Sequence, residues 1–231
     1  MFSLSMGEWR AKQSTKVART LWYVTLFHCA AMLPYSQATL QQLRQDFGIR
    51  VETRSFLPPL IPLALPGWLN EYLAVNELTP AFTRSEKAIS ELLIAPVLTA
   101  VKQYHADKIS LFSGEALTGT DVFGICDFII ASNPNAYLPE PPIMVLVEAK
   151  KQDLYGAIPQ CIAEMRAAQQ VNAQAGYSPE AIYGCVTIGS EWLFLQLKDT
   201  QAFTHPHVFY YPQLDEVLAV FRWIIAQFIP A

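Results

Sequence analysis

The stretch Met144–Lys151, MVLVEAKK, limits the fold most strongly, because an apolar run of strand character ends in charged residues. Apolar side chains alternate between both faces of such a strand, so the strand must be buried within a sheet. By the same alternation Glu148 and Lys150 share one face, while Ala149 points the other way. The fold must therefore account for a carboxylate and an ammonium group at the end of a buried strand.

The rest of the sequence alternates between helical and strand patterns. Helices are expected over 85–104, 157–176 and 214–229, and strands over 109–112, 122–132, 143–151, 181–190 and 191–199. The order helix, three strands, helix, two strands, helix predicts an α/β or α+β fold with a central mixed β-sheet flanked by helices. A composition that is 52% hydrophobic and 16% charged supplies enough apolar residues for its core.

Two segments precede this main domain, which we place at residues 68–231. Residues 37–67 predict a short helix, capped by Thr39 and stopped by Gly48, and then an extended proline-rich arm that packs on the main domain. Four prolines in FLPPLIPLALPGW exclude a regular helix or a central strand from that arm.

Residues 1–36 form an N-terminal extension whose basic segment is followed by an apolar run, Leu21–Leu33. This run is shorter than the roughly 20 residues of a membrane-spanning helix, so no membrane partner is expected. We expect a dispensable extension, or translation that begins at Met32; export or anchoring is the alternative.

The cysteines indicate a reducing compartment. None of them forms a CxxC pair, and their spacings fit no zinc site: Cys29, Cys126, Cys161 and Cys185. We therefore expect buried free thiols and a cytoplasmic location.

A second charged residue, Asp127, interrupts the apolar strand over 122–132, where a carboxylate is costly without compensation. The loop over 133–142 is of hairpin type, so this strand and the next should be antiparallel, with Asp127 beside Glu148. Two adjacent carboxylates raise each other's pKa unless a cation lies between them, and Mg²⁺ suits such oxygen ligands. With Lys150 at the rim to position a water or neutralise charge, the set predicts phosphodiester hydrolysis.

Asp127, a hairpin loop and then Glu148-Ala149-Lys150 resemble the core of the PD-(D/E)XK nuclease superfamily, the fold of many restriction endonucleases. The resemblance implies a restriction endonuclease-like core in which Asp127 and Glu148 hold Mg²⁺ or Mn²⁺. It also implies a nucleic-acid substrate, with DNA favoured over RNA, and it is compatible with a homodimer, since many such enzymes dimerise. Gln160, near the start of the next helix, occupies a position that is often Gln in the superfamily.

The superfamily helix that precedes the strands often carries an acid, and here Glu86 and Glu91 are both candidates. Five residues apart on a helix, they are expected to point to different faces. The proline of the superfamily name is absent, because Ile125-Cys126 precedes Asp127. The segments SEKAISE, FSG, CDFI, VEAKK, QCIAEM and YGCVTIGSEWLFL also resemble a family of uncharacterised proteins common in cyanobacteria, over residues 37–228.

The overall charge favours an alternative function. The formal net charge is −4, and the core lacks an obvious basic region for reading DNA. A catalytically inactive restriction endonuclease-like module that binds nucleic acid or a protein partner is therefore the second hypothesis. Metal binding distinguishes the two, because an intact carboxylate pair should bind Mg²⁺ and a degenerate one should not.

Overall fold

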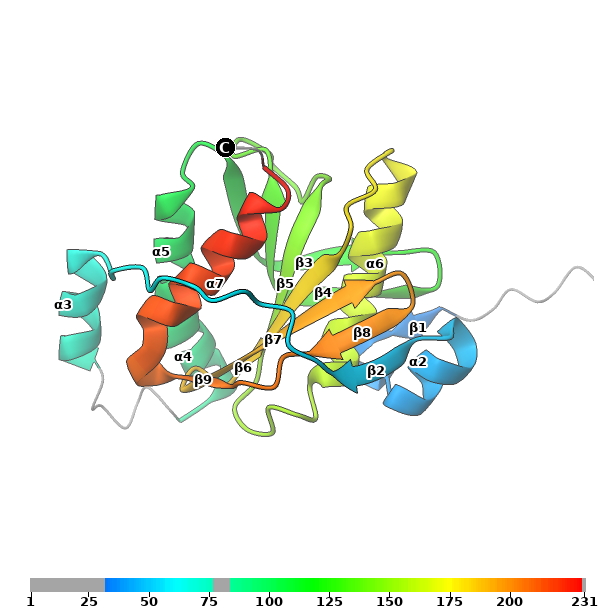
Figure 1. The fold of residues 1–231 in the computed structure, drawn as a ribbon, viewed down its shortest axis with the longest axis horizontal. Coiled ribbons are helices and arrows are strands. Elements are labelled where there is room, and N and C mark those ends of the chain that lie inside the picture. Colours follow the sequence, from blue (N-terminus) through cyan, green and yellow to red (C-terminus); the bar gives the residue numbers. More distant parts are fainter. Residues whose placement is uncertain (1–31, 77–83, 230–231) are drawn as a thin grey trace, which may run out of the picture. The chain divides into compact units, whose positions relative to one another are not determined.

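A computed structural model describes residues 32–76 and 84–229, and the structural statements below concern these residues. The chain from Met32 onward forms one compact unit. Within it, a curled mixed β-sheet is flanked by helices (Figure 1), as the order of sequence patterns predicts.

The described part of the sheet contains nine strands. Their bounds are β1 Leu33–Pro34, β2 Arg50–Thr53, β3 Ile109–Thr118, β4 Val122–Ser132, β5 Ile143–Ala149, β6 Ile182–Thr187, β7 Glu191–Lys198, β8 Gln201–Thr204 and β9 Phe209–Tyr210. The strand order is β1-β4-β5-β6-β7-β8-β2, with β3 also paired to β4 and β9 to β7. β4 and β5 are antiparallel, which confirms the expected hairpin, and β5 and β6 are parallel across a helical crossover.

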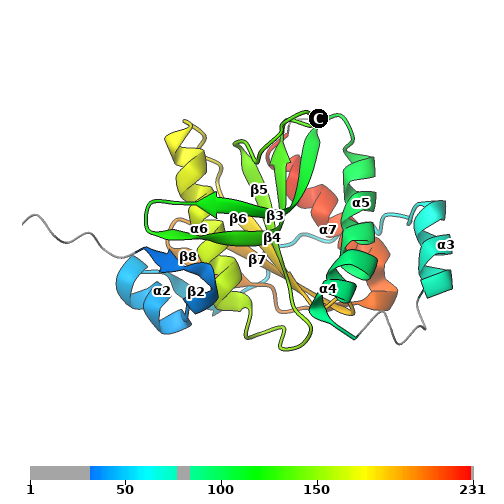
Figure 2. The same ribbon diagram turned by 180° about the vertical axis from the view of Figure 1, so that it is seen from behind.

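Helices cover both faces of the sheet. Their bounds are α2 Leu40–Phe47, α3 Gly67–Asn76, α4 Glu86–Ile89, α5 Ala95–Tyr104, α6 Ile158–Gln174 and α7 Leu214–Ala226, with short 3₁₀ turns at Tyr35–Gln37 and Tyr211–Gln213. Two hydrophobic cores result: one beneath α3, α5 and α7, the other beneath α2 and α6. Seen from behind, α6 lies on one side of the central strands and α5 with α7 on the other (Figure 2).

The first helix and the arm confirm their sequence signals. Thr39 Oγ1 accepts a hydrogen bond from the Gln42 N–H and caps α2, and Gly48 ends the helix with a φ of 70°. The arm over 54–66 has no regular secondary structure (Figure 1). Its Leu and Phe side chains pack on the first core. The residues between α2 and the arm form β2, which joins the same sheet as the rest of the chain.

Two expectations about the strands were incomplete. β3 runs beyond the expected strand over 109–112 through Ser113-Gly114-Glu115; Gly114 takes a φ of 72°, and the pairing with β4 omits Gly114 and resumes in the same register at Glu115. The sequence patterns did not reveal β1, β2, β8 or β9, because strands of two to four residues are too short to show alternation.

The helix expected over 85–104 is interrupted. Ser85 caps α4 as expected, but Ser90–Ile94 is π-helical before α5 begins. Pro96 explains the change, because it lacks an N–H and its ring would clash with the carbonyl four residues earlier in a regular α-helix. A wider π turn relieves that clash and redirects the side chains of this segment.

The described cysteines, Cys126, Cys161 and Cys185, are free and buried, as expected; Cys29 lies outside the described residues. Most of the 1–36 extension, including the basic segment and most of the apolar run, also lies outside them. Among the helices of residues 32–76 and 84–229, none has the length and apolar character needed to cross a bilayer.

Candidate functional site

The two strand carboxylates are neighbours. The β4–β5 register pairs Phe128 with Val147, which places Asp127 beside Glu148 at the end of β5. Asp127 Oδ2 accepts a hydrogen bond of 2.8 Å from the backbone N–H of Ala149. This side-chain bond links β4 to the end of β5, beyond the last backbone pair of the two strands. Asp127 is half-buried, and Glu148 is 1% exposed.

Lys150 follows the last residue of β5 and stays on the Glu148 face. Its Nζ forms an ion pair with Glu148 Oε1. Its backbone N–H donates to the carbonyl of Thr187 on β6, at 2.9 Å, which fixes the chain just beyond the strand. The side chain of Lys150 is 28% exposed, so it meets both the buried carboxylate and the solvent.

Both acids of the preceding helix border the same pocket. This pocket of about 280 Å³ is lined by Glu86, Lys87, Ser90, Glu91, Ser113, Asp127 and Ala149. Glu86 lies in α4 and Glu91 in the π-helical segment, and the pocket contacts both acids although they stand five residues apart.

The two acids nevertheless have different partners. Glu86 Oε2 accepts a hydrogen bond of 3.3 Å from the backbone N–H of Lys151, the residue after Lys150. Glu91 forms an exposed ion pair with Lys87, at 3.6 Å. Glu86 thus contacts the E-x-K segment directly, and Glu91 lies at the pocket rim.

Gln160 reaches the site through a residue that the sequence reasoning missed. Its Nε2 donates to Glu164 Oε1, at 3.2 Å, one turn further along α6. Glu164 is fully buried and lies within hydrogen-bonding contact of Glu148. Gln160 and Glu164 are four residues apart and share a helix face, but a single acid on a helix gives no sequence signal that it is buried.

Helix α6 is fixed to β5 at its other end as well. The side chain of buried Asn172 accepts from the Ile143 N–H, at 2.7 Å, and donates to the Ile143 carbonyl, at 2.8 Å. Because α6 is anchored at the first residue of β5, its opposite end has a defined position against the last residues of that strand. This holds Glu164 against Glu148.

Burial controls the protonation of the acids. Desolvation raises the pKa of Asp127, although the Ala149 N–H and Lys150 oppose the shift. Desolvation and the charge of Asp127 raise the pKa of Glu148 to about 7, and desolvation with the nearby Glu148 raises the pKa of Glu164 well above its usual value. Burial would lower the pKa of Lys150, but its bond to Glu148 outweighs this and raises it.

The carboxylates fit a divalent cation as a pair rather than as a larger cluster. Within the described ranges, no three His, Cys, Asp or Glu side chains are grouped so that they could hold a metal ion. However, Glu148 Oε2 is buried without a hydrogen-bond partner, and Asp127 lines the adjoining pocket. Mg²⁺ commonly takes one or two carboxylates and keeps several waters, so Asp127 and Glu148 could hold it.

Comparisons with known proteins assign neither a family nor a function to this chain. The sequence matches no model of a known protein family, and no curated protein matches it at a significant level. The site must therefore be interpreted from its own geometry.

Proposed function

We propose that this protein is a Mg²⁺- or Mn²⁺-dependent nuclease with a restriction endonuclease-like core of the PD-(D/E)XK type. The observation that carries the proposal is the meeting of Asp127, Glu148 and Lys150 at the end of β5. The element order adds support: an acid-bearing helix, then β4 with the aspartate, β5 with Glu148-Ala149-Lys150, and α6 with Gln160.

Each side chain has a defined task in this proposal. Asp127 and Glu148 would hold the metal ion, which, when bound, polarises the phosphate and lowers the pKa of its water. Lys150, half-buried beside Glu148, would position the attacking water or neutralise the charge that develops on the phosphate. Glu86 holds the backbone after Lys150 in place, and Gln160 acts through Glu164.

The partner would be nucleic acid, with DNA favoured over RNA. Exposed Lys87 lines the pocket and exposed Lys151 contacts Glu86 beside it, so both offer positive charge to a phosphate backbone. The free, buried thiols of the described cysteines suit a cytoplasmic protein, because disulfides rarely persist there.

The test is a cleavage assay with Mg²⁺ or Mn²⁺ on single- and double-stranded DNA and RNA, with Lys150→Ala beside the wild type. Metal-dependent cleavage that is lost in the variant would support the proposal. Cleavage that the variant retains would show that Lys150 is not catalytic. Calorimetry of Mg²⁺ binding to the wild type and to Asp127→Asn gives a readout that needs no substrate.

The second candidate is a binding module that keeps the fold without catalysis. The favouring observation is that no described group of three acidic, His or Cys side chains could hold a metal, while Lys150 already neutralises Glu148. This candidate predicts that calorimetry detects no heat of Mg²⁺ binding and that neither DNA nor RNA is cleaved. Metal binding by the wild type, lost in Asp127→Asn, would exclude it.

A further inference from the structure

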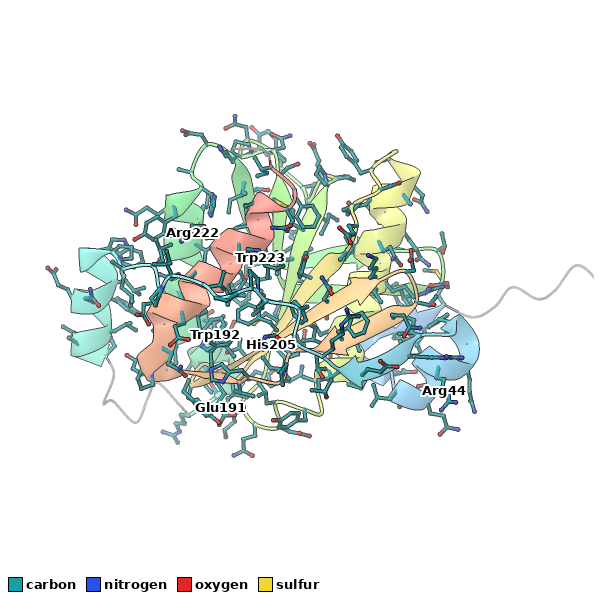
Figure 3. All side chains as sticks on the ribbon, viewed as in Figure 1. Arg44, Glu191, Trp192, His205, Arg222 and Trp223 are labelled. Carbon is teal, nitrogen blue, oxygen red and sulfur yellow. The ribbon has the colours of Figure 1, made fainter. Side chains whose placement is uncertain are left out.

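Within residues 32–76 and 84–229, strand β2 leaves one edge of the sheet open. Among the described strands it is the last in the order and pairs only with β8. A groove of about 730 Å³ runs along this edge, lined by Leu40, Gln41, Arg44 and Gln45 of α2 and by Ile49, Arg50, Val51 and Glu52. Arg44 lies on α2 beside the groove (Figure 3).

The backbone of β2 shows which residues offer free hydrogen-bonding groups. Arg50 N–H donates to the Thr200 carbonyl and Arg54 N–H to the Thr204 carbonyl, each at 3.0 Å. In a parallel ladder alternate residues bond to the neighbouring strand, so the intervening Val51 and Thr53 turn their N–H and C=O groups outward. An added strand would therefore have to bond to Val51 and Thr53.

The side chains of this edge suit a second copy of the same strand. The sequence Arg50-Val51-Glu52 is self-complementary when two copies run antiparallel about Val51. Val51 then faces its counterpart as a hydrogen-bonded pair, and each Arg50 faces a Glu52 in the adjacent pair, where side chains approach most closely. Arg50 and Glu52 are exposed, and neither has an ion-pair or side-chain hydrogen-bond partner within the described residues.

Other registers are less favourable. Pairing about Glu52 would still let Val51 and Thr53 bond to each other, but it would set Glu52 against Glu52 and Arg50 against Arg54, so like charges would face each other. Pairing about Thr53 would set Glu52 against Arg54, whose guanidinium already lies 5.1 Å from the centre of the Phe203 ring. Edge strands often carry charge to prevent association, but a strand that alternates opposite signs attracts its own copy.

We propose that β2 is a homodimer interface, in which two copies pair antiparallel about Val51 and join their sheets through reciprocal Arg50–Glu52 ion pairs. Exposed Leu40 on α2 supplies apolar contact at the rim of the same groove. The interface lies on β2 and α2, and it involves none of the residues of the proposed nuclease site. It can therefore be tested whether or not the protein cleaves nucleic acid.

The test is sedimentation of the full chain over a range of concentrations, with Arg50→Glu and Glu52→Arg studied separately and mixed. Each single variant sets like charges opposite each other twice, so the dimer should weaken by about tenfold or more. In the mixture, the two acidic side chains of the Arg50→Glu chain face the two arginines of the Glu52→Arg chain, so both pairs become complementary again. The mixture should therefore form a heterodimer with close to wild-type affinity.

Asp107→Arg is a matched control, because Asp107 is exposed in the turn before β3 and the substitution changes the charge as Glu52→Arg does. It should leave the dimer unchanged. A wild-type chain that stays monomeric at every concentration would overturn the proposal. So would a dimer that tolerates both single variants, or one that Arg54→Glu disrupts while Arg50→Glu does not.

Discussion

Glu164 of α6 lies fully buried against Glu148 of β5, and each side chain keeps its Oε2 atom without a hydrogen-bond partner. Two carboxylates this close cannot both be ionised without strong repulsion in a poorly solvated site. A proton held between them removes the repulsion and supplies the missing donor. The packing of α6 on the end of β5 is therefore coupled to protonation.

We predict that this pair makes stability depend on pH. Folding raises the pKa of Glu148 from 4.5 to about 7, so the folded chain keeps a proton that the unfolded chain loses within this window. The proton on Glu148 stabilises the folded chain fully below pH 4.5, the pKa of this group in the unfolded chain. This stabilisation is lost as the pH rises through about 7, the pKa of Glu148 in the folded chain. The free energy of unfolding, measured by urea titration, should fall by about 1–3 kcal/mol as the pH rises from 4.5 to about 7.

Glu164→Gln provides the matched comparison. The amide keeps a hydrogen-bond acceptor for Gln160 and a permanent donor for Glu148, with no proton to lose. The variant should show a flatter pH dependence than the wild type and should be the more stable of the two above neutral pH. Equal slopes for the two proteins would show that the carboxyl pair does not control stability.

We predict different effects of the two pocket acids on activity. Glu86→Gln weakens the contact with the Lys151 N–H and removes a negative charge that acts on Lys150 and Asp127. It should lower cleavage by about tenfold or more, which corresponds to roughly 1.4 kcal/mol. Glu91→Gln only breaks an exposed pair with Lys87, so cleavage should stay within about twofold. The opposite ranking would assign the helix acid to Glu91.

We predict that Gly189 cannot be replaced by alanine at low cost. Gly189 has a φ of 82° in the β6–β7 turn, and an added Cβ would lie 2.7 Å from Leu93 and 2.8 Å from Ile89. Both side chains are buried on the interrupted helix next to the site, so Gly189→Ala should cost about 2–4 kcal/mol of unfolding free energy. The turn thus supports the position of the pocket acids.

Gly176 is the control for this prediction. Its φ is 83°, almost the same, but nothing lies within 4 Å of an added Cβ. Gly176→Ala should therefore show only the backbone strain of a left-handed residue, roughly 1–2 kcal/mol. If both variants lose the same stability in urea titrations, the steric contact with the helix contributes nothing.

Sequence periodicity was sufficient for the long elements, because each carries its own signal. β4 matches its expected range of 122–132, and α6, at Ile158–Gln174, lies within its expected range of 157–176. The hairpin loop predicted that β4 and β5 are antiparallel neighbours, and the observed register places Asp127 beside Glu148. What remained hidden depends on tertiary contacts, as with β2, whose four residues become a strand only because β8 lies beside them.

In the site, too, some residues could be predicted from the sequence, whereas others gain their role only from tertiary contacts. A pattern of residue types identifies acids that stand out from an apolar strand, but Glu164 stands on a helix, where a single acid is ordinary. Its importance comes from full burial against Glu148, which only the packing of α6 creates. Likewise, the pocket that Glu86 and Glu91 both line also needs Ser113 of β3, Asp127 of β4 and Ala149 of β5, which only the tertiary packing brings to this helix.

We finally predict that the ion pair between Asp121 and Arg166 contributes to stability. Arg166 donates to both oxygens of Asp121, at 2.9 and 2.5 Å, and its guanidinium lies 4.4 Å from the centre of the Phe47 ring. Burial alone would raise the pKa of Asp121, but bonds from Arg166 and Gln170 outweigh it and lower the pKa. This contact ties the β3–β4 turn, α6 and α2 together.

Asp121→Asn should lower the free energy of unfolding by about 1–2 kcal/mol near neutral pH, because Arg166 is left half-buried without its anion. The difference should disappear as the pH falls through the lowered pKa, where the wild-type Asp121 is itself protonated. Glu180→Gln, which breaks the exposed pair with Lys198, should leave the free energy of unfolding almost unchanged. Equal losses in the two variants would show that the bidentate geometry and the Phe47 contact add nothing to the Asp121 pair.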